Sequence, residues 1–420
     1  MGFNSKEVGQ IDGWIQCCAC SENYFTSQTS RYPSTFYKAI AMATDELVGK
    51  LVFQSRSILE KLCYAKTDII ASDRTKDRVN YVLFGGKLNI KGRVIRGGIK
   101  VAADPSKYYT ETTVGIHKAN RYSGKLRRRY ILLSYLLGVF NKYVYKQNPI
   151  KGKSIDIYGN EINLGGIDWN DIAIPSSFRE NIEQNLLWPV FYPHVLKDAG
   201  LRLSRGVLLE GERGMGKTLV SKIIAEQIRG KGTFIKLRPS DVEKLGWDYV
   251  FQVARILEPS ILYLEDIDTF SSDKFSVSTF LTDMFDYLEG STERGNVGLL
   301  VTTNMPNSID MRFKNRPGRI DRRLVFDPHN KQHFDINWQK EVLGIYLNGH
   351  KTSTTIDEVI GLTKDDTLTA AHLRELVYSA RLRALTRLGI QNSNISNSEL
   401  ELRLEDFKAA REDMASVIEK

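Results

Sequence analysis

The eight residues GERGMGKT at 211–218 limit the possible folds of this chain more than any other stretch. They fit the pattern G-x-x-x-x-G-K-[ST], which cradles phosphate groups where a strand precedes it and a helix follows. RGVLLE at 205–210 has the composition of a buried strand, and KTLVSKIIAEQIRG at 217–230 that of a helix ended by glycine. The sequence therefore predicts a strand–loop–helix unit that binds phosphates, and the flanking elements disfavour a chance glycine-rich turn.

This loop predicts a site for ATP and Mg²⁺. Its glycines let backbone N–H groups turn inward, and the following helix directs its positive end at the phosphates. Lys217 is expected to reach the β- and γ-phosphates, and the hydroxyl of Thr218 to bind Mg²⁺. The predicted nucleotide contacts of the loop are Gly211, Glu212, Arg213, Gly214, Met215, Gly216, Lys217, Thr218 and Leu219.

Strands alternate with helices over residues 166–330, which predicts a parallel sheet sandwiched by helices, with ligands at the carboxyl ends of its strands. Residues 331–420 predict an all-helical lid. Before this core, residues 34–70 predict helices, 79–117 a small sheet, and 130–145 an apolar helix, so 1–165 is expected to be an α+β domain that binds a substrate or partner. The predicted core strands are 205–210, 233–237, 261–266, 297–304 and 323–327.

The run ILYLEDID at 261–268 predicts a buried strand that ends in acids beside the phosphates. In such sites one carboxylate holds Mg²⁺ and a second group orients the attacking water. We assign Glu265 to the metal and Asp266 to the water, although the usual order is Asp then Glu. Because aspartate is one methylene shorter than glutamate, we expect slow but real hydrolysis. The alternative is a scaffold that binds ATP without hydrolysing it.

Two further features follow the acidic strand. Asn304 ends the run LLVTTN, where it can reach the γ-phosphate or the attacking water. NRPGRID places Arg316 and Arg319 on a rigid turn, and their forked donors suit the phosphoryl oxygens of a nucleotide bound by a neighbouring subunit. The alternative interpretation of this turn is a surface loop with salt bridges.

Taken in order, these segments, with IDWNDIAI at 167–174 and TLTAAHLRELVYSA at 367–380, resemble the AAA subclass of the AAA+ ATPases over about residues 166–420. The resemblance implies a ring-shaped homo-oligomer, a hexamer or heptamer, that remodels protein substrates as a chaperone does. It makes Asn304 a sensor and the two arginines fingers that act in trans. It also implies further nucleotide contacts from Asp171, Ile172, Ala173, Ala370 and Ala371.

The order LEDID is similar to the branch that contains the mitochondrial translocase of the Rieske iron–sulfur protein. That branch has a β-rich domain before its ATPase core and a shortened pore region. Here KLGWDYV at 244–250 stands where the family has a pore loop. Trp247 either grips a substrate or packs internally, and we favour packing.

The net charge of +9 is concentrated in residues 86–130, which hold twelve Lys and Arg against two Asp and Glu, with tyrosines among them. Cations interleaved with aromatics fit single-stranded nucleic acid, but we favour a solvated basic face or a surface for an acidic protein. A nucleic-acid-associated motor or loader is therefore the alternative to a protein remodeller. Binding that falls steeply with salt would distinguish them.

The most apolar run, at 130–145, is broken by Asn141 and Lys142 and is shorter than the roughly 20 residues of a membrane span. The first residues lack the apolar core of a secretory signal. The four cysteines are interpreted as reduced thiols. We therefore expect a cytoplasmic or otherwise soluble intracellular protein with no membrane span.

Overall fold

The computed structural model describes part of the chain, in two compact units. One unit comprises Met1–Lys151, Ile157–Asn160 and Asp248–Leu257, and the other Gly152–Asp156, Glu161–Trp247 and Glu258–Lys420. The described residues are 24–33, 39, 64–66, 82–90, 93–103, 109–117, 142–269, 295–305, 320–363, 367–389 and 400–418.

The first unit contains an antiparallel sheet in the order β1-β5-β4-β3-β2. Its strands are β1 (Tyr24–Pro33), β2 (Tyr64–Lys66), β3 (Val82–Ile90), β4 (Arg93–Ala103) and β5 (Tyr109–His117). The sheet predicted over 79–117 is thus present. The prediction of helix throughout 34–70 is wrong at 64–66, because these residues pair with β3. Of the apolar helix predicted at 130–145, the structure describes only the π-helical turn η3 (Lys142–Lys146).

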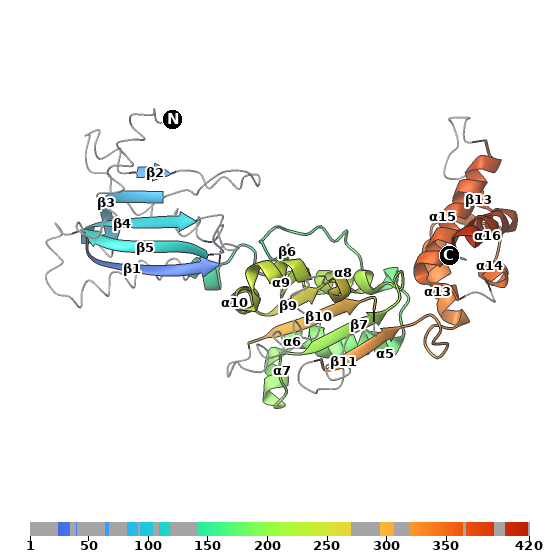
Figure 1. Ribbon diagram of the computed structural model, residues 1–420, viewed down its shortest axis with the longest axis horizontal. Helices are drawn as coiled ribbons and strands as arrows, with labels where there is room; N and C mark the ends of the chain where they lie inside the picture. Colours follow the sequence, from blue (N-terminus) through green and yellow to red (C-terminus); the bar gives the residue numbers. More distant parts are fainter. Residues whose placement is uncertain are drawn as a thin grey trace. The chain divides into compact units, whose positions relative to one another are not determined.

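The second unit is built on a six-stranded parallel sheet in the order β11-β7-β10-β9-β8-β6 (Figure 1). The strands are β6 (Ser154–Asp156), β7 (Gly206–Gly211), β8 (Thr233–Leu237), β9 (Ser260–Leu264), β10 (Val297–Thr303) and β11 (Arg322–Phe326). The five strands predicted for the core are confirmed within two residues at each end, and so is the parallel α/β fold class. Strand β6 lies within residues 1–165, the predicted N-terminal domain, but it pairs with β8 of the second unit.

Helices and short turns surround this sheet before the lid begins. They are η4 (Trp169–Asp171), α5 (Ser176–Ile182), η5 (Glu183–Leu187), α6 (Trp188–Phe191), α7 (Pro193–Asp198), α8 (Lys217–Gln227), α9 (Pro239–Leu245) and η6 (Ile267–Thr269). Helix α10 (Trp247–Ile256) belongs to the first unit from Asp248 onward. All residues of β7, β9 and β10 are buried, as expected for apolar strands covered on both faces. Trp247 is 7% exposed, which confirms the packed interpretation of this side chain.

The lid consists of α13 (Ile336–Leu347), α14 (Ile356–Thr363), α15 (Ala370–Arg387) and α16 (Leu404–Ile418), with one short parallel pair, β12 (Lys351–Thr352) and β13 (Glu401–Leu402). The last helix, α16, begins after β13. Aromatic rings join the lid to the sheet, because the Phe334 ring centroid lies 5.2 Å from that of Trp338 on α13 and 6.1 Å from that of Phe326 on β11. In the described parts of the chain, no helix combines the length and apolarity needed to cross a bilayer.

Candidate functional site

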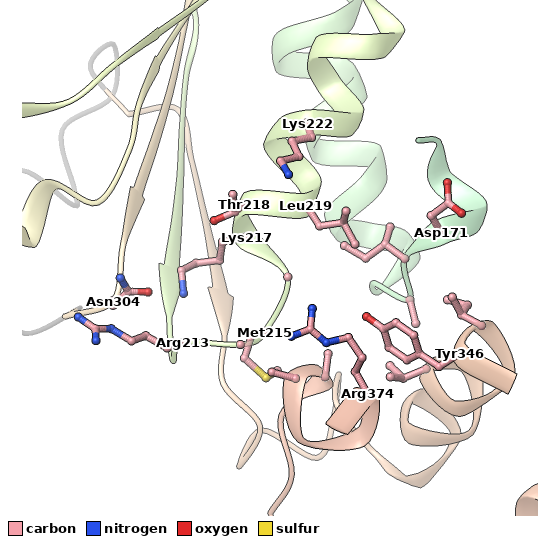
Figure 2. Close-up of a pocket in the computed structure, with 18 of the residues that line it drawn as sticks. Asp171, Arg213, Met215, Lys217, Thr218, Leu219, Lys222, Asn304, Tyr346 and Arg374 are labelled. Atoms are coloured by element: carbon pink, nitrogen blue, oxygen red, sulfur yellow. The ribbon is translucent and has the colours of Figure 1, made fainter. Parts of the chain in front are cut away.

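A cavity of about 420 Å³ lies in the second unit, where the loop after β7 meets the ends of β9 and β10 and the lid helices α13 and α15 (Figure 2). Six segments that are separate in sequence therefore share one site. The lining residues are Asp171, Ile172, Ala173, Arg213, Gly214, Met215, Gly216, Lys217, Thr218, Leu219, Lys222, Asp266, Asn304, Val342, Ile345, Tyr346, Ala370, Ala371 and Arg374.

The loop between β7 and α8 depends on glycine at two positions. Gly211 pairs with Phe326 of the neighbouring strand, and a Cβ on Gly211 would lie 2.0 Å from the Phe326 carbonyl oxygen. Gly214 has a φ of +82°, in the left-handed region that L side chains rarely adopt. The loop can therefore bend tightly against β11 and deliver Lys217 as the first residue of α8.

Lys217 is held inside the loop. Its side-chain Nζ donates hydrogen bonds of 2.7 Å to the carbonyl oxygens of Gly211 and Glu212. Burial lowers the pKa of Lys217 to about 8, although Asp266 and Asp268 oppose the shift. The amine is therefore mainly charged at pH 7, and phosphate oxygens are natural replacements for its two carbonyl partners. Gly211 and Glu212 support the cavity through this contact without lining it.

Asp266 brings a carboxylate into the cavity from the end of β9. Its backbone φ of +48° is uncommon for a residue other than glycine, and its N–H donates to Thr302 Oγ1 at 3.0 Å. Burial raises the pKa of Asp266, with smaller contributions in the same direction from Asp268 and Glu265, while Lys217 and a hydrogen bond with the Asn304 side chain oppose it. The structure thus brings Asp266, Asn304 and Lys217 to one place.

Glu265 lies outside the cavity lining. Its Oε2 is 2.7 Å from Lys236 Nζ on β8, which makes an ion pair of two partly buried side chains. A Mg²⁺ role for Glu265 requires this carboxylate to exchange Lys236 for the metal. By contrast, the nearby Asp268, whose role no sequence motif indicated, accepts hydrogen bonds from Thr303 Oγ1 at 2.9 Å and from Asn304 N at 2.8 Å. Asp268 therefore holds the end of β10, and with it Asn304, in position.

The lid reaches the loop through the beginning of α15. The Ala371 N–H donates a 2.9 Å hydrogen bond to the Gly214 carbonyl oxygen. This bond joins the start of α15 to the loop between β7 and α8. Thr369 and His372 form a reciprocal cap, with Thr369 N–His372 Nδ1 at 3.2 Å and His372 N–Thr369 Oγ1 at 3.3 Å. Ala370 and Ala371, the predicted lid residues, accordingly line the cavity.

The predicted segment 171–173 is fixed from both sides. Asp168 Oδ1 accepts from Asn170 N at 2.7 Å, and Asp168 N donates to Asp171 Oδ2 at 2.8 Å, which caps the short turn η4. Trp338 Nε1 of α13 donates to the Ala173 carbonyl oxygen at 3.0 Å. All three residues of this segment line the cavity, as do residues of the loop and of the lid.

Several lining residues could not be named from the motifs. Lys222 follows Thr218 by four residues on α8, and helical spacing could have indicated it. Tyr346 and Arg374 come from lid helices, and only tertiary packing brings them to the cavity; Figure 2 shows both side chains extending from the lid toward the loop and segment 171–173. Arg316 and Arg319 lie outside the described residues.

A strand–glycine loop–helix unit at the carboxyl edge of a parallel sheet defines the class of P-loop nucleotide-binding domains. Residues 207–328 match the family described as "ATPase family associated with various cellular activities (AAA)". The chain therefore contains an AAA domain of the AAA+ ATPase superfamily.

Three relatives illustrate the similarity. The "26S proteasome regulatory subunit 4 homolog" of Saccharomyces cerevisiae is 28% identical over 260 residues, which cover 58% of this chain and 55% of that protein. "Proteasome-activating nucleotidase 1" of Halobacterium salinarum is 27% identical over 60% of this chain and 59% of its own. "Peroxisomal ATPase PEX1" of Dictyostelium discoideum is 30% identical over 56% of this chain but only 19% of its own. The match thus spans little more than half, or less, of each relative.

Proposed function

We propose that this chain is an ATPase that binds ATP with Mg²⁺ in the cavity described above and hydrolyses it to ADP and phosphate. The observation that carries this proposal is the convergence of Lys217, Thr218, Asp266 and Asn304 on one cavity beneath a helical lid. The matching family and the relatives named as ATPases support the same activity.

The cavity fits a nucleotide by size and by chemistry. Its volume of about 420 Å³ lies within the roughly 300–1,000 Å³ of small-molecule sites. The loop and the start of α8 offer N–H groups and a helix dipole to phosphates, and Lys217 adds a positive charge. Ile172, Ala173, Val342 and Ile345 provide apolar surface for a base on the side of the lid.

In this proposal the residues divide the reaction among them. The loop and Lys217 hold the phosphates, Thr218 with Glu265 holds Mg²⁺, and Asp266 orients the attacking water and accepts its proton. Mg²⁺ contributes positive charge that offsets the negative charge of the phosphates. The raised pKa of Asp266 brings this carboxylate nearer to working pH, which suits a general base. Asn304 positions the water, and Arg316 and Arg319 act on the nucleotide of a neighbouring subunit.

The two acids can be separated by matched amide variants. In ATP hydrolysis assays, Asp266→Asn should bind ATP but not turn it over, whereas Glu265→Gln should weaken the Mg²⁺ dependence. If Glu265→Gln leaves the Mg²⁺ requirement unchanged while Asp266→Asn raises it, the metal belongs to Asp266. Lys217→Ala should abolish nucleotide binding in both backgrounds.

We further propose that the protein acts as a ring-shaped homo-oligomer, a hexamer or heptamer, that remodels protein substrates, with residues 1–165 recognising them. The similarity to relatives named as proteasome regulatory subunits and as a cell division cycle protein 48 homolog supports a role in protein remodelling. The nucleic-acid alternative has no comparable support. Proteins that co-purify with Asp266→Asn in the presence of ATP, and not with Lys217→Ala, would identify the substrate. Recovery of nucleic acid alone would reject the proposal.

A further inference from the structure

We propose that Glu212, Asp327 and His329 form a second ligand site, which binds a divalent transition-metal ion such as Zn²⁺ outside the nucleotide cavity. One carboxylate oxygen from each acid and one ring nitrogen of the histidine all lie within 4.8 Å of one another. None of the three side chains lines the nucleotide cavity. The site is therefore distinct from the Mg²⁺ site of the proposed ATPase reaction.

The backbone holds these residues together without a metal. Glu212 N donates to the Phe326 carbonyl oxygen at 3.2 Å, which joins the loop after β7 to the end of β11. The glycine at 211 allows this approach, because a Cβ there would collide with the same carbonyl. Asp327 follows Phe326 directly, so the backbone of Asp327 lies close to that of Glu212.

A turn at residues 327–330 places His329 near Asp327 and Glu212. Asp327 Oδ1 accepts from His329 N at 2.9 Å, and the Asp327 carbonyl oxygen accepts from Asn330 N at 3.0 Å. Two segments far apart in sequence thus present their ligands on a preformed frame, which lowers the ordering cost of binding an ion.

The spacing between the histidine and Glu212 leaves room for a bridging ion. His329 Nε2 lies 3.7 Å from Glu212 Oε1, which is too long for a hydrogen bond. Donor atoms bound to a tetrahedral ion at about 2.1 Å lie roughly 3.4 Å apart, by simple geometry from the usual bond lengths. A shift of a few tenths of an ångström would therefore close this pair around an ion.

The donor set indicates which ions fit. One imidazole nitrogen and two carboxylates suit Zn²⁺, Co²⁺ or Mn²⁺, whereas Mg²⁺ and Ca²⁺ prefer oxygen ligands alone. The side chains of His329 and Glu212 are 67% and 53% exposed, so an ion can enter from solvent. The two neighbouring carboxylates repel each other, and the attraction of each to a divalent cation would offset that repulsion.

The test is a Co²⁺ titration of nucleotide-free protein comprising residues 1–420, with equilibrium dialysis to count bound ions. Co²⁺ replaces Zn²⁺ and reports its ligands by absorption, and thiolate ligands from the N-terminal cysteines would give a distinct charge-transfer band. His329→Asn should bind one ion fewer per chain than the wild type, or bind it at least tenfold more weakly. The matched control, His194→Asn, changes an exposed histidine on α7 and should bind as the wild type does.

Glu212→Gln provides a second variant at an exposed side chain, so that misfolding of one variant does not decide the result. It should lose the same ion as His329→Asn. Equal stoichiometry and affinity in the wild type and in both variants would overturn the proposal. The result is independent of ATP hydrolysis, because it is read from metal binding alone.

Discussion

Replacement of Gly214 by alanine should separate the lid from the loop. A Cβ at this position would lie 2.7 Å from the Ala371 Cβ and 3.0 Å from Thr369 Oγ1. The lid must therefore move, and the 2.9 Å hydrogen bond from Ala371 N to the Gly214 carbonyl oxygen should weaken. The new alanine also has to adopt a positive φ.

These two costs can be separated with a matched control. An alanine in the left-handed region costs about 1–2 kcal/mol, and overpacking costs about 1–3 kcal/mol more. Gly200 has a φ of +71° at the end of α7, where Leu201 N donates to the Leu196 carbonyl oxygen at 2.8 Å, and a Cβ on Gly200 would meet no atom within 4 Å. Gly200→Ala should therefore show only the backbone cost. The excess of about 1–3 kcal/mol in Gly214→Ala corresponds to roughly a 5- to 150-fold change in an equilibrium constant.

Hydrogen exchange of the Ala371 amide measures this excess directly in nucleotide-free protein. Gly214→Ala should accelerate its exchange by about that factor, whereas Gly200→Ala should leave it unchanged. Adding Ala371→Gly to Gly214→Ala removes the colliding methyl group and should restore part of the protection. Equal exchange in the two alanine variants, or no rescue by Ala371→Gly, would refute the lid contact.

Three other substitutions test neighbouring parts of the site. Arg323→Met removes an ion-pair partner of the fully buried Glu210, so the free energy of unfolding in urea should fall by up to about 3–5 kcal/mol, and replacing both residues by leucine should restore most of it. The pKa of Lys217 is lowered in the fold, so the unfolded chain keeps a proton between pH 8 and 10.5 that the folded chain releases. Stability of the nucleotide-free protein should therefore rise by up to about 3 kcal/mol across that window, and Lys217→Met should lack this rise. Trp338→Phe removes the hydrogen bond to the Ala173 carbonyl and should destabilise the lid by about 1 kcal/mol, measured as weaker ATP binding.

The sheet was predictable because its strands are buried on both faces. Runs such as 261–264 and 297–303 are apolar or small throughout, and their order along the chain fixes a parallel α/β arrangement. Strand β6 has only three residues, and its local pattern does not indicate that it pairs with β8. Short strands depend on their tertiary partner, which a local pattern does not contain.

The site was predictable where a motif specifies backbone geometry and was not where packing supplies the residue. The loop positions 213–219 and Ala370 and Ala371 line the cavity as expected. Tyr346 and Arg374 reach it only because α13 and α15 cross the loop at a particular angle. The pairing of Lys236 with Glu265 was likewise not predictable, since the two residues meet across neighbouring strands.

The most direct test of the account is ATP turnover by the wild type beside Lys217→Ala and Asp266→Asn, with nucleotide binding measured on the same samples. We expect slow hydrolysis by the wild type, no nucleotide binding by Lys217→Ala, and binding without turnover by Asp266→Asn. Normal turnover by Asp266→Asn would contradict the role given to this carboxylate. ATP binding by the wild type with no release of phosphate would contradict the ATPase assignment itself.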